Sequence, residues 1–174
     1  VVAYDPYQHE DIFAELDVER VGLGELLDRA DCVSVHTALT AETHHLLSAP
    51  EFERMKDDAV VVNTARGPIV DERALVEAIE SGSLWGAGLD VFETEPPKDA
   101  PAFESERIVV SPHRAGMSDR AEQRCIDIGL EKISAALEGR HLGEIVNPEA
   151  YGGADQFSPE RSYWESGEDA DFST

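Results

Sequence analysis

Short apolar segments alternate with longer mixed segments along most of the chain. Each apolar segment has the length and composition of a strand, and together they cover residues 1–4, 32–36, 59–63, 86–91 and 108–110. The segment at 59–63 is apolar on both faces, which is typical of a strand inside a parallel sheet. Residues 9–30 are expected to be helical or loop-like. Strands that alternate with helical segments predict β-α-β units around a parallel sheet.

The segments between the strands carry helix signals. Asp71 is expected to begin a helix that ends before Gly82. Ser48 and Glu51 have the spacing of a capping box. A longer helix is predicted over residues 118–139, and its apolar face is expected to pack against the core through Ile126, Leu130, Ile133 and Leu137.

The two ends of the chain differ from the rest. The chain opens within an apolar strand, so we expect a preceding segment in the natural protein. Residues 151–174 hold six acids against one arginine among small polar residues, which is typical of a disordered segment. We therefore predict one partial domain over residues 1–148 and an acidic, disordered tail over 149–174. Alternatively, the tail aromatics Tyr163 and Trp164 dock on a partner or on the domain.

The chain is strongly acidic. It has 14 Lys and Arg residues against 37 Asp and Glu residues, and its formal net charge is −23. Such a surface repels nucleic acids and anionic membranes. Few lysines among many acids predict a protein adapted to molar salt, with an ordinary acidic protein as the alternative. Both cysteines, Cys32 and Cys125, are expected to be reduced and buried, as in a cytoplasmic protein.

Polar and ionisable residues follow each predicted strand. In a parallel sheet the carboxyl ends of the strands lie at one edge, where ligands bind. The residues at this edge are Asp5, His36, Thr37, residues 64–67, residues 90–95 and His113. A carboxylate at the position of Asp5 suits the two hydroxyl groups of an adenosine ribose. The alternative is a turn aspartate before Pro6.

Three motifs occur in a fixed order along the chain: Asn63-Thr64-Ala65-Arg66-Gly67, Gly88-Leu89-Asp90-Val91-Phe92 with Glu95-Pro96, and Ser111-Pro112-His113. Together they resemble the D-isomer-specific 2-hydroxyacid dehydrogenases, and the resemblance covers residues 1–148. Within that family the chain looks most like the C-terminal-binding-protein branch, followed by the phosphoglycerate dehydrogenase branch. The resemblance implies an α/β fold with a Rossmann-type, doubly wound parallel sheet that lacks its first β-α unit and the substrate domain.

The resemblance also implies an NAD-dependent oxidoreductase that interconverts a 2-oxo acid and a D-2-hydroxy acid. Arg66 is then expected to bind the substrate carboxylate through two parallel hydrogen bonds. His113 is expected to give a proton to the carbonyl oxygen and to take it back in the reverse reaction. Glu95 is expected to pair with His113, to orient its ring and to favour the imidazolium.

The implied cofactor is NAD, because Asp5 is followed by Pro6 and Tyr7 without a neighbouring arginine. The expected contacts are Asp5 and Pro6 at the adenosine ribose, His36, Thr37, Ala38, Leu39 and Thr43 at the adenine side, Thr64, Ala65, Arg66 and Asp90 towards the nicotinamide, and His113, Ala115 and Gly116 beside its ring. A homodimer is implied by the resemblance as well. No metal site is predicted, because the spacing of paired ligands is lacking among Cys32, His36, His44 and His45.

The chain departs from the family pattern in ways that leave other functions open. Ala38 stands where many members have proline, and Gly116 stands where the C-terminal-binding proteins have tryptophan. The glycine-rich β-α unit and the substrate domain are missing from the sequence, so we expect this chain alone to be a poor enzyme. The alternatives are an NAD(H)-responsive regulatory protein of the C-terminal-binding-protein type and an inactive fragment.

Overall fold

The computed structural model describes residues 1–138 and 140. The chain forms two compact units, of which the first is Val1–Gly116 and the second begins at Met117. In chain order the first unit contains β1 (Val2–Ala3), α1 (Glu10–Glu15), β2 (Glu19–Arg20), α2 (Leu23–Arg29), β3 (Cys32–Val35), α3 (Ala49–Phe52), β4 (Val60–Asn63), a 3₁₀ helix (Gly67–Ile69), α4 (Glu72–Ser81), β5 (Gly86–Leu89), a second 3₁₀ helix (Pro101–Glu104) and β6 (Ile108–Val110). The described part of the second unit is α5 (Asp119–Leu137).

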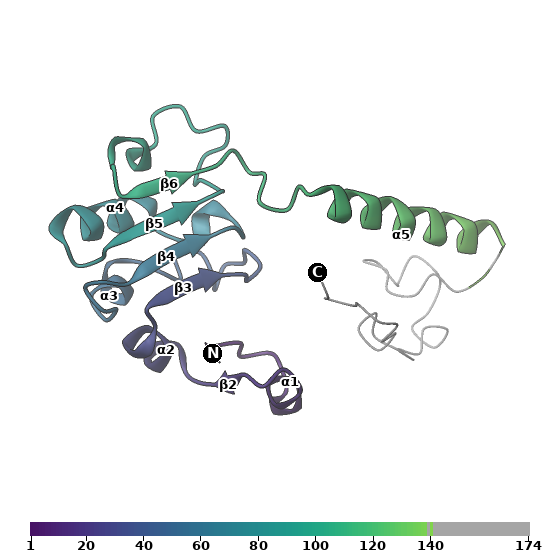
Figure 1. The fold of residues 1–174 in the computed structure, drawn as a ribbon, viewed down its shortest axis with the longest axis horizontal. Helices are drawn as coiled ribbons and strands as arrows, with labels where there is room; N and C mark the ends of the chain where they lie inside the picture. Colours follow the sequence, from purple (N-terminus) through teal and green to yellow (C-terminus); the bar gives the residue numbers. More distant parts are fainter. Residues whose placement is uncertain (139, 141–174) are drawn as a thin grey trace. The chain divides into compact units, whose positions relative to one another are not determined.

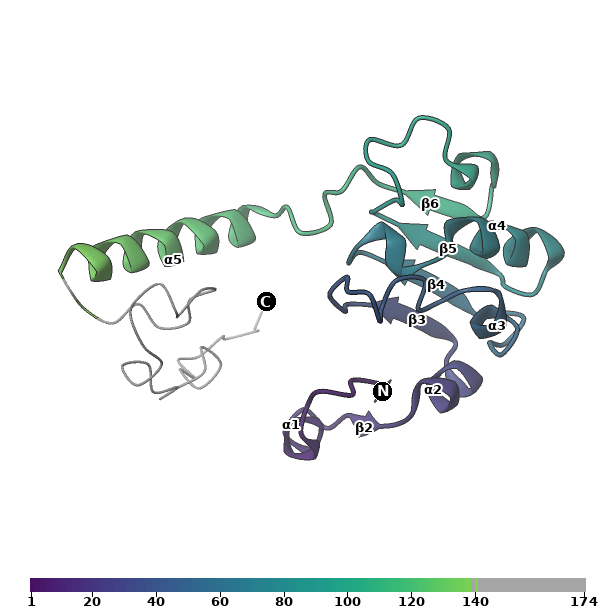
Figure 2. The ribbon, with the colours of Figure 1, turned by 180° about the vertical axis from the view of Figure 1, so that it is seen from behind.

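Four strands form a parallel sheet in the order β3-β4-β5-β6 (Figures 1 and 2). Val35 pairs with Asn63, Asn63 with Leu89, and Leu89 with Val110, so the last residues of the four strands form one row. The predicted parallel α/β sheet is therefore confirmed. This register also brings the residues that follow each strand to the same edge.

The first two strands form a separate parallel sheet, with Val2 paired to Glu19 and Ala3 to Arg20. β1 is not hydrogen-bonded to β3, which is the arrangement expected for a sheet that lacks the strand between them. The sequence did not predict β2, because its two residues are both charged and give no apolar pattern.

One face of the four-stranded sheet carries the core. Val33, Val61 and Leu89 point to this face and pack with Leu27 of α2, Phe52 of α3 and the α4 residues Leu75 and Ile79. On the opposite face Cys32, Ser34 and Val109 are exposed. The prediction that Cys32 is buried is therefore wrong. Successive side chains of the edge strand β3 point to opposite faces of the sheet, and that of Cys32 points away from the helices.

The predicted helix ends of the first unit are confirmed. The Ser48 side chain and the Glu51 side chain form a capping box at α3. The Asp71 carboxylate accepts a hydrogen bond from the Ala74 backbone amide, and α4 ends at Gly82 with a left-handed φ of 85°.

The second unit confirms the predicted helix. α5 begins after Ser118, whose side chain accepts a hydrogen bond from Ala121, but only Ala135 is buried along the described helix. Within this unit as described, the side chains of Ile126, Leu130, Ile133, Leu137 and Cys125 are exposed, and the packing of this helix face and of Cys125 against a core stays a prediction. A helical period shows which side chains share a face, but it does not supply the surface that covers them.

Two further expectations bear on the chain as a whole. The predicted boundary at residue 148 and the predicted disordered tail lie outside the described residues. Among the helices of the described part, none has both the length and the apolar content needed to cross a bilayer.

Candidate active site

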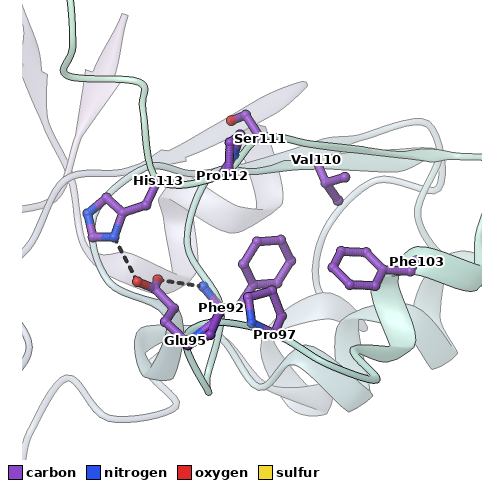
Figure 3. A pocket seen from close by; sticks show the side chains of 9 residues that line it. Phe92, Glu95, Pro97, Phe103, Val110, Ser111, Pro112 and His113 are labelled. Carbon is purple, nitrogen blue, oxygen red and sulfur yellow. Dashed lines mark hydrogen bonds and ion pairs between the residues drawn. The ribbon is translucent and has the colours of Figure 1, made fainter.

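His113 and Glu95 form a hydrogen-bonded pair just beyond the ends of β6 and β5 (Figure 3). His113 Nδ1 lies 2.8 Å from Glu95 Oε2, and the Phe92 backbone amide donates to Glu95 Oε1 at 3.1 Å. The His113 hydrogen bond, followed by the one from Phe92, holds the pKa of Glu95 below its usual value. The Glu95 carboxylate is therefore held in its charged form beside His113 Nδ1.

The backbone around His113 is held in an uncommon conformation, with φ 53°. Buried Asp90 stabilises this segment: its Oδ1 accepts hydrogen bonds from Ser111 Oγ and from the Arg114 amide, and its Oδ2 accepts one from the Ala115 amide. Burial acts to raise the pKa of Asp90, but these hydrogen bonds outweigh it and the pKa is lowered. Asp90 was expected only as a cofactor contact, so its role in holding the His113 loop is a finding of the structure.

Arg66 follows β4 in a turn that is held by Asn63. The Asn63 side chain donates to the Arg66 carbonyl at 3.0 Å and accepts from the Ala65 amide at 3.1 Å. The Arg66 side chain is exposed, and its positive charge also lowers the pKa of Glu95. The structure thus places the three predicted catalytic side chains, Arg66, Glu95 and His113, at one edge of the sheet.

Gly67 explains how the Arg66 turn meets the loop that carries Glu95. A Cβ atom at Gly67 would lie 1.9 Å from the carbonyl carbon and oxygen of Phe92, and 2.5 Å from the Glu93 nitrogen. Main chain therefore packs directly on main chain, which only glycine permits. The sequence pattern did not predict the role of Asn63 in holding this turn, although an amide side chain at the end of an apolar strand was a signal for it.

A mostly apolar pocket of about 380 Å³ lies beside the His113–Glu95 pair (Figure 3). Its lining residues are Phe92, Glu95, Pro96, Pro97, Phe103, Val110, Ser111, Pro112 and His113. Phe92 and Phe103 make an edge-to-face contact, with their ring centroids 5.5 Å apart. The pair thus has an apolar surrounding on one side, where few polar groups compete for its hydrogen bond.

The predicted adenosine-side residues follow β1 and β3. Asp5 Oδ1 accepts the Tyr7 amide at 2.9 Å, which is the hydrogen bond of a turn aspartate, the alternative interpretation of this residue. A carboxylate that accepts one such bond keeps acceptor capacity for a ribose. Thr43 Oγ1 donates to the Ala38 carbonyl at 2.7 Å, and Tyr7 Oη donates to Glu42 at 2.6 Å.

The predicted cofactor contacts fall into three groups. His36, Thr37, Ala38, Leu39 and Thr43 follow β3, whereas the carboxyl ends of β4, β5 and β6 bring together Thr64, Ala65, Arg66, Asp90, His113, Ala115 and Gly116. Asp5 and Pro6 follow β1 in the other sheet. Within residues 1–138 and 140, no group of three or more His, Cys, Asp or Glu side chains is placed to hold a metal ion.

Residues 1–115 match the family model described as "D-isomer specific 2-hydroxyacid dehydrogenase, NAD binding domain". The chain belongs to this family. It is 41% identical over 150 residues to a glyoxylate reductase of Korarchaeum cryptofilum, covering 86% of this chain and 45% of that protein. It is 42% identical over 147 residues to a D-3-phosphoglycerate dehydrogenase of Mycobacterium bovis, covering 84% of this chain and 28% of the relative.

Solved structures agree with this family. The fold is similar to the D-lactate dehydrogenase with NAD+ from Lactobacillus jensenii, with a TM-score of 0.74 and 28% identity over 84% of this chain and 48% of that one. The chain spans less than half the length of each of these three proteins. Family membership confirms the Rossmann-like NAD-binding fold and NAD as its cofactor. The buried, hydrogen-bonded Asp90 and the polar residues that follow the strands at this edge of the sheet fit a group that presents amide and hydroxyl donors.

Proposed function

We propose that this chain is the nucleotide-binding part of a D-2-hydroxyacid dehydrogenase that interconverts a small 2-oxo acid and a D-2-hydroxy acid. The observation that carries the proposal is the 2.8 Å pair of His113 and Glu95 at the same sheet edge as Arg66. An imidazole, a carboxylate that orients it and a guanidinium can supply the proton and the substrate binding for reduction of a 2-oxo acid.

His113 is the proton donor in this proposal. Its Nδ1 is engaged by Glu95, so Nε2 is the nitrogen that gives a proton to the carbonyl oxygen and takes it back from the hydroxyl group. The lowered pKa of Glu95 keeps this carboxylate charged, so it can orient the His113 ring through Nδ1.

Arg66 binds the substrate carboxylate and orients the carbonyl group. A planar guanidinium offers two parallel N–H donors to a carboxylate, an arrangement that a lysine cannot reproduce. The Asn63 hydrogen bonds on both sides of this turn fix the main chain from which the side chain extends.

NAD, when bound, supplies or accepts the hydride. Asp5 and Pro6 would contact the adenosine ribose, and His36, Thr37, Ala38, Leu39 and Thr43 would line the adenine side. Thr64, Ala65 and Asp90 would hold the nicotinamide ribose and carboxamide. His113, Ala115 and Gly116 would hold the nicotinamide ring.

The setting of the enzyme is part of the proposal. A formal net charge of −23 on 174 residues with three lysines supports a protein that works in a salt-rich cytoplasm, where screening reduces self-repulsion. The active form is proposed to be a homodimer.

The proposal is tested by titrating NADH fluorescence with this chain in dilute buffer and in molar KCl, followed by a screen of 2-oxo acids. Saturable binding with turnover supports the dehydrogenase, and a binding step that needs salt supports the halophilic setting. The matched variant is Arg66→Lys, which retains the charge and is expected to lower kcat/KM about a hundredfold.

Other outcomes point to the alternatives. Tight NADH binding without turnover favours a regulatory protein that responds to NAD(H). Absence of NADH binding with a cooperative thermal transition refutes nucleotide binding by this chain alone. Absence of both binding and a thermal transition identifies an inactive fragment.

A further inference from the structure

Glu93 lies two residues before Glu95 and makes contacts that the proposed chemistry does not use. Its Oε1 accepts a hydrogen bond from the Glu72 backbone amide at 3.0 Å, at the first residue of α4. The same oxygen lies 3.2 Å from His45 Nε2. Glu93 therefore joins three segments: the loop after β5, the start of α4 and the loop before α3.

Glu72, at the start of α4, also contacts Glu93 through its side chain. Its Oε2 accepts the Glu93 backbone amide at 3.5 Å, and its side chain is buried. Its Oε1 has no hydrogen-bond partner among the described residues. Burial, opposed by hydrogen bonds from the backbone amides of Glu93 and Ala102, raises the pKa of Glu72. The two glutamates thus hold each other's main chain, at the cost of burying a carboxyl group.

His45 connects the same loop to the helix cap. Its Nδ1 lies 3.8 Å from Asp71, the N-cap residue of α4, while its Nε2 faces Glu93. The His45 backbone amide donates to the Pro68 carbonyl at 2.8 Å, next to the Arg66–Gly67 turn. The ring therefore sits between two carboxylates that belong to different elements.

We propose that Glu93 is a positioning residue for the His113–Glu95 pair, because its carboxylate ties the Glu95 loop to α4 and to His45. The loop between Phe92 and Glu95 is short, and its main chain rests on Gly67. Loss of the Glu93 contacts frees this loop to lift from Gly67, which moves the Glu95 carboxylate away from His113 Nδ1. The inference rests on the proposed function for its catalytic meaning, but not for its geometry.

Arg66 provides an internal contrast. Its turn is held separately by Asn63 through two hydrogen bonds. A change at Glu93 should therefore disturb proton transfer more than binding of the substrate carboxylate. This difference separates a positioning role from general loss of the fold.

The test compares Glu93→Ala and Glu93→Asp with Glu93→Gln and the control Glu106→Ala. Glu93→Asp keeps the charge but shortens the reach, whereas Glu93→Gln keeps an oxygen that can accept from Glu72. Glu106 is exposed and precedes β6. The first readout is the ¹⁵N spectrum of the His113 ring in the 174-residue chain, with His113→Asn for its assignment.

In the natural sequence the neutral His113 ring should carry its proton on Nδ1, facing Glu95. We expect Glu93→Ala and Glu93→Asp to shift the ratio of the two ring tautomers about fivefold towards Nε2. Glu93→Gln should restore most of the Nδ1 form, and Glu106→Ala should leave the ratio unchanged. Wherever NADH-dependent 2-oxo acid reduction is measurable, Glu93→Ala should lower kcat about tenfold or more with KM within about twofold.

An unchanged His113 spectrum in Glu93→Ala, or in Glu93→Asp if the alanine variant does not fold, overturns the proposal. An equal effect of Glu106→Ala overturns it too. If the natural chain shows the expected tautomer but binds no NADH in dilute buffer or in molar KCl, the proposed function fails while the positioning role stands.

Discussion

The two ends of the predicted nucleotide site are built differently. At the catalytic end, buried Asp90 and Asn63 hold the loops through hydrogen bonds to the main chain, and Gly67 brings two main-chain segments into contact. At the adenosine end, the contacts run between exposed side chains such as Tyr7 and Glu42. Buried polar contacts lose much more when one partner is removed than exposed ones do, so the two ends should respond unequally to mutation.

The largest effect is expected from Gly67→Ala. The new methyl group would overlap the Phe92 carbonyl group, which is main chain and cannot rotate away. We expect a loss of about 3 kcal/mol or more in the free energy of unfolding, measured by urea denaturation. The matched control is Gly129→Ala in α5, where the added Cβ meets no atom within 4 Å and should stabilise the helix by roughly 0.5–1 kcal/mol. Equal stability of the two variants would contradict the main-chain contact.

The second effect concerns Asp90→Asn. The Asp90 carboxylate accepts three hydrogen bonds, from Ser111 Oγ and from the Arg114 and Ala115 amides. In the asparagine variant an NH₂ group faces one of these donors and cannot accept from it. We therefore expect a loss of about 2 kcal/mol in the free energy of unfolding. Hydrogen–deuterium exchange should show faster exchange at the Arg114 and Ala115 amides. Unchanged exchange at these two amides would show that Asp90 does not hold the His113 loop.

The hydrogen bonds that Asp90 and Glu95 accept should also make the stability depend on pH. The pKa values of Asp90 and Glu95 are both lower in the folded protein than in an unfolded chain. Their contribution to stability is therefore complete above the ordinary carboxyl pKa of about 4 and is lost as the pH falls through their folded values. The urea midpoint should therefore decrease as the pH is lowered from about 6 to about 3. In Asp90→Asn this decrease should be smaller.

A smaller effect of opposite sign is expected from Glu72→Gln. Because burial raises the pKa of Glu72, the folded protein binds this proton more tightly than the unfolded chain does, and the charged form costs stability as the pH rises above about 4. The glutamine should therefore stabilise the protein by about 1 kcal/mol at pH 7, and by less at pH 4. Glu106→Gln, an exposed control, should show no such pH-dependent gain. A loss of stability in Glu72→Gln at pH 7 would contradict this account.

The smallest effect is expected from Tyr7→Phe at the adenosine end. The hydrogen bond from Tyr7 to Glu42 joins two exposed side chains, so its removal should leave the free energy of unfolding unchanged within the error of urea denaturation. Tyr4→Phe is the control. A loss comparable to that of Asp90→Asn would remove the contrast between the two ends.

The sequence predicted the parts of the molecule where local pattern and tertiary structure agree. Apolar runs such as Val60–Asn63 form strands, and Asp71 and Gly82 cap the two ends of α4. Strand burial and helix capping depend on residues that are close in sequence, so a local pattern predicts them. The resemblance placed Arg66, Glu95 and His113 in separate motifs, and the aligned strand ends bring them to one edge. Their roles in the reaction stay predictions.

Other features depend on contacts between distant residues, and no local pattern contains them. Glu72 and Glu93 look like ordinary acids of a helix and a loop until the fold joins them. The outward orientation of Cys32 depends on which face of the sheet α2, α3 and α4 cover.

The common row formed by Val35, Asn63, Leu89 and Val110 also indicates where the chain tolerates an insertion. A residue inserted within a strand would slide everything that follows it out of this row. The turn at Gly82 and Ser83 precedes β5 at the other edge of the sheet and is largely solvent-accessible, so added chain there leaves the row in place. A reporter domain carried at this turn would follow the state of the protein from a distance, without touching the chemistry at the opposite edge.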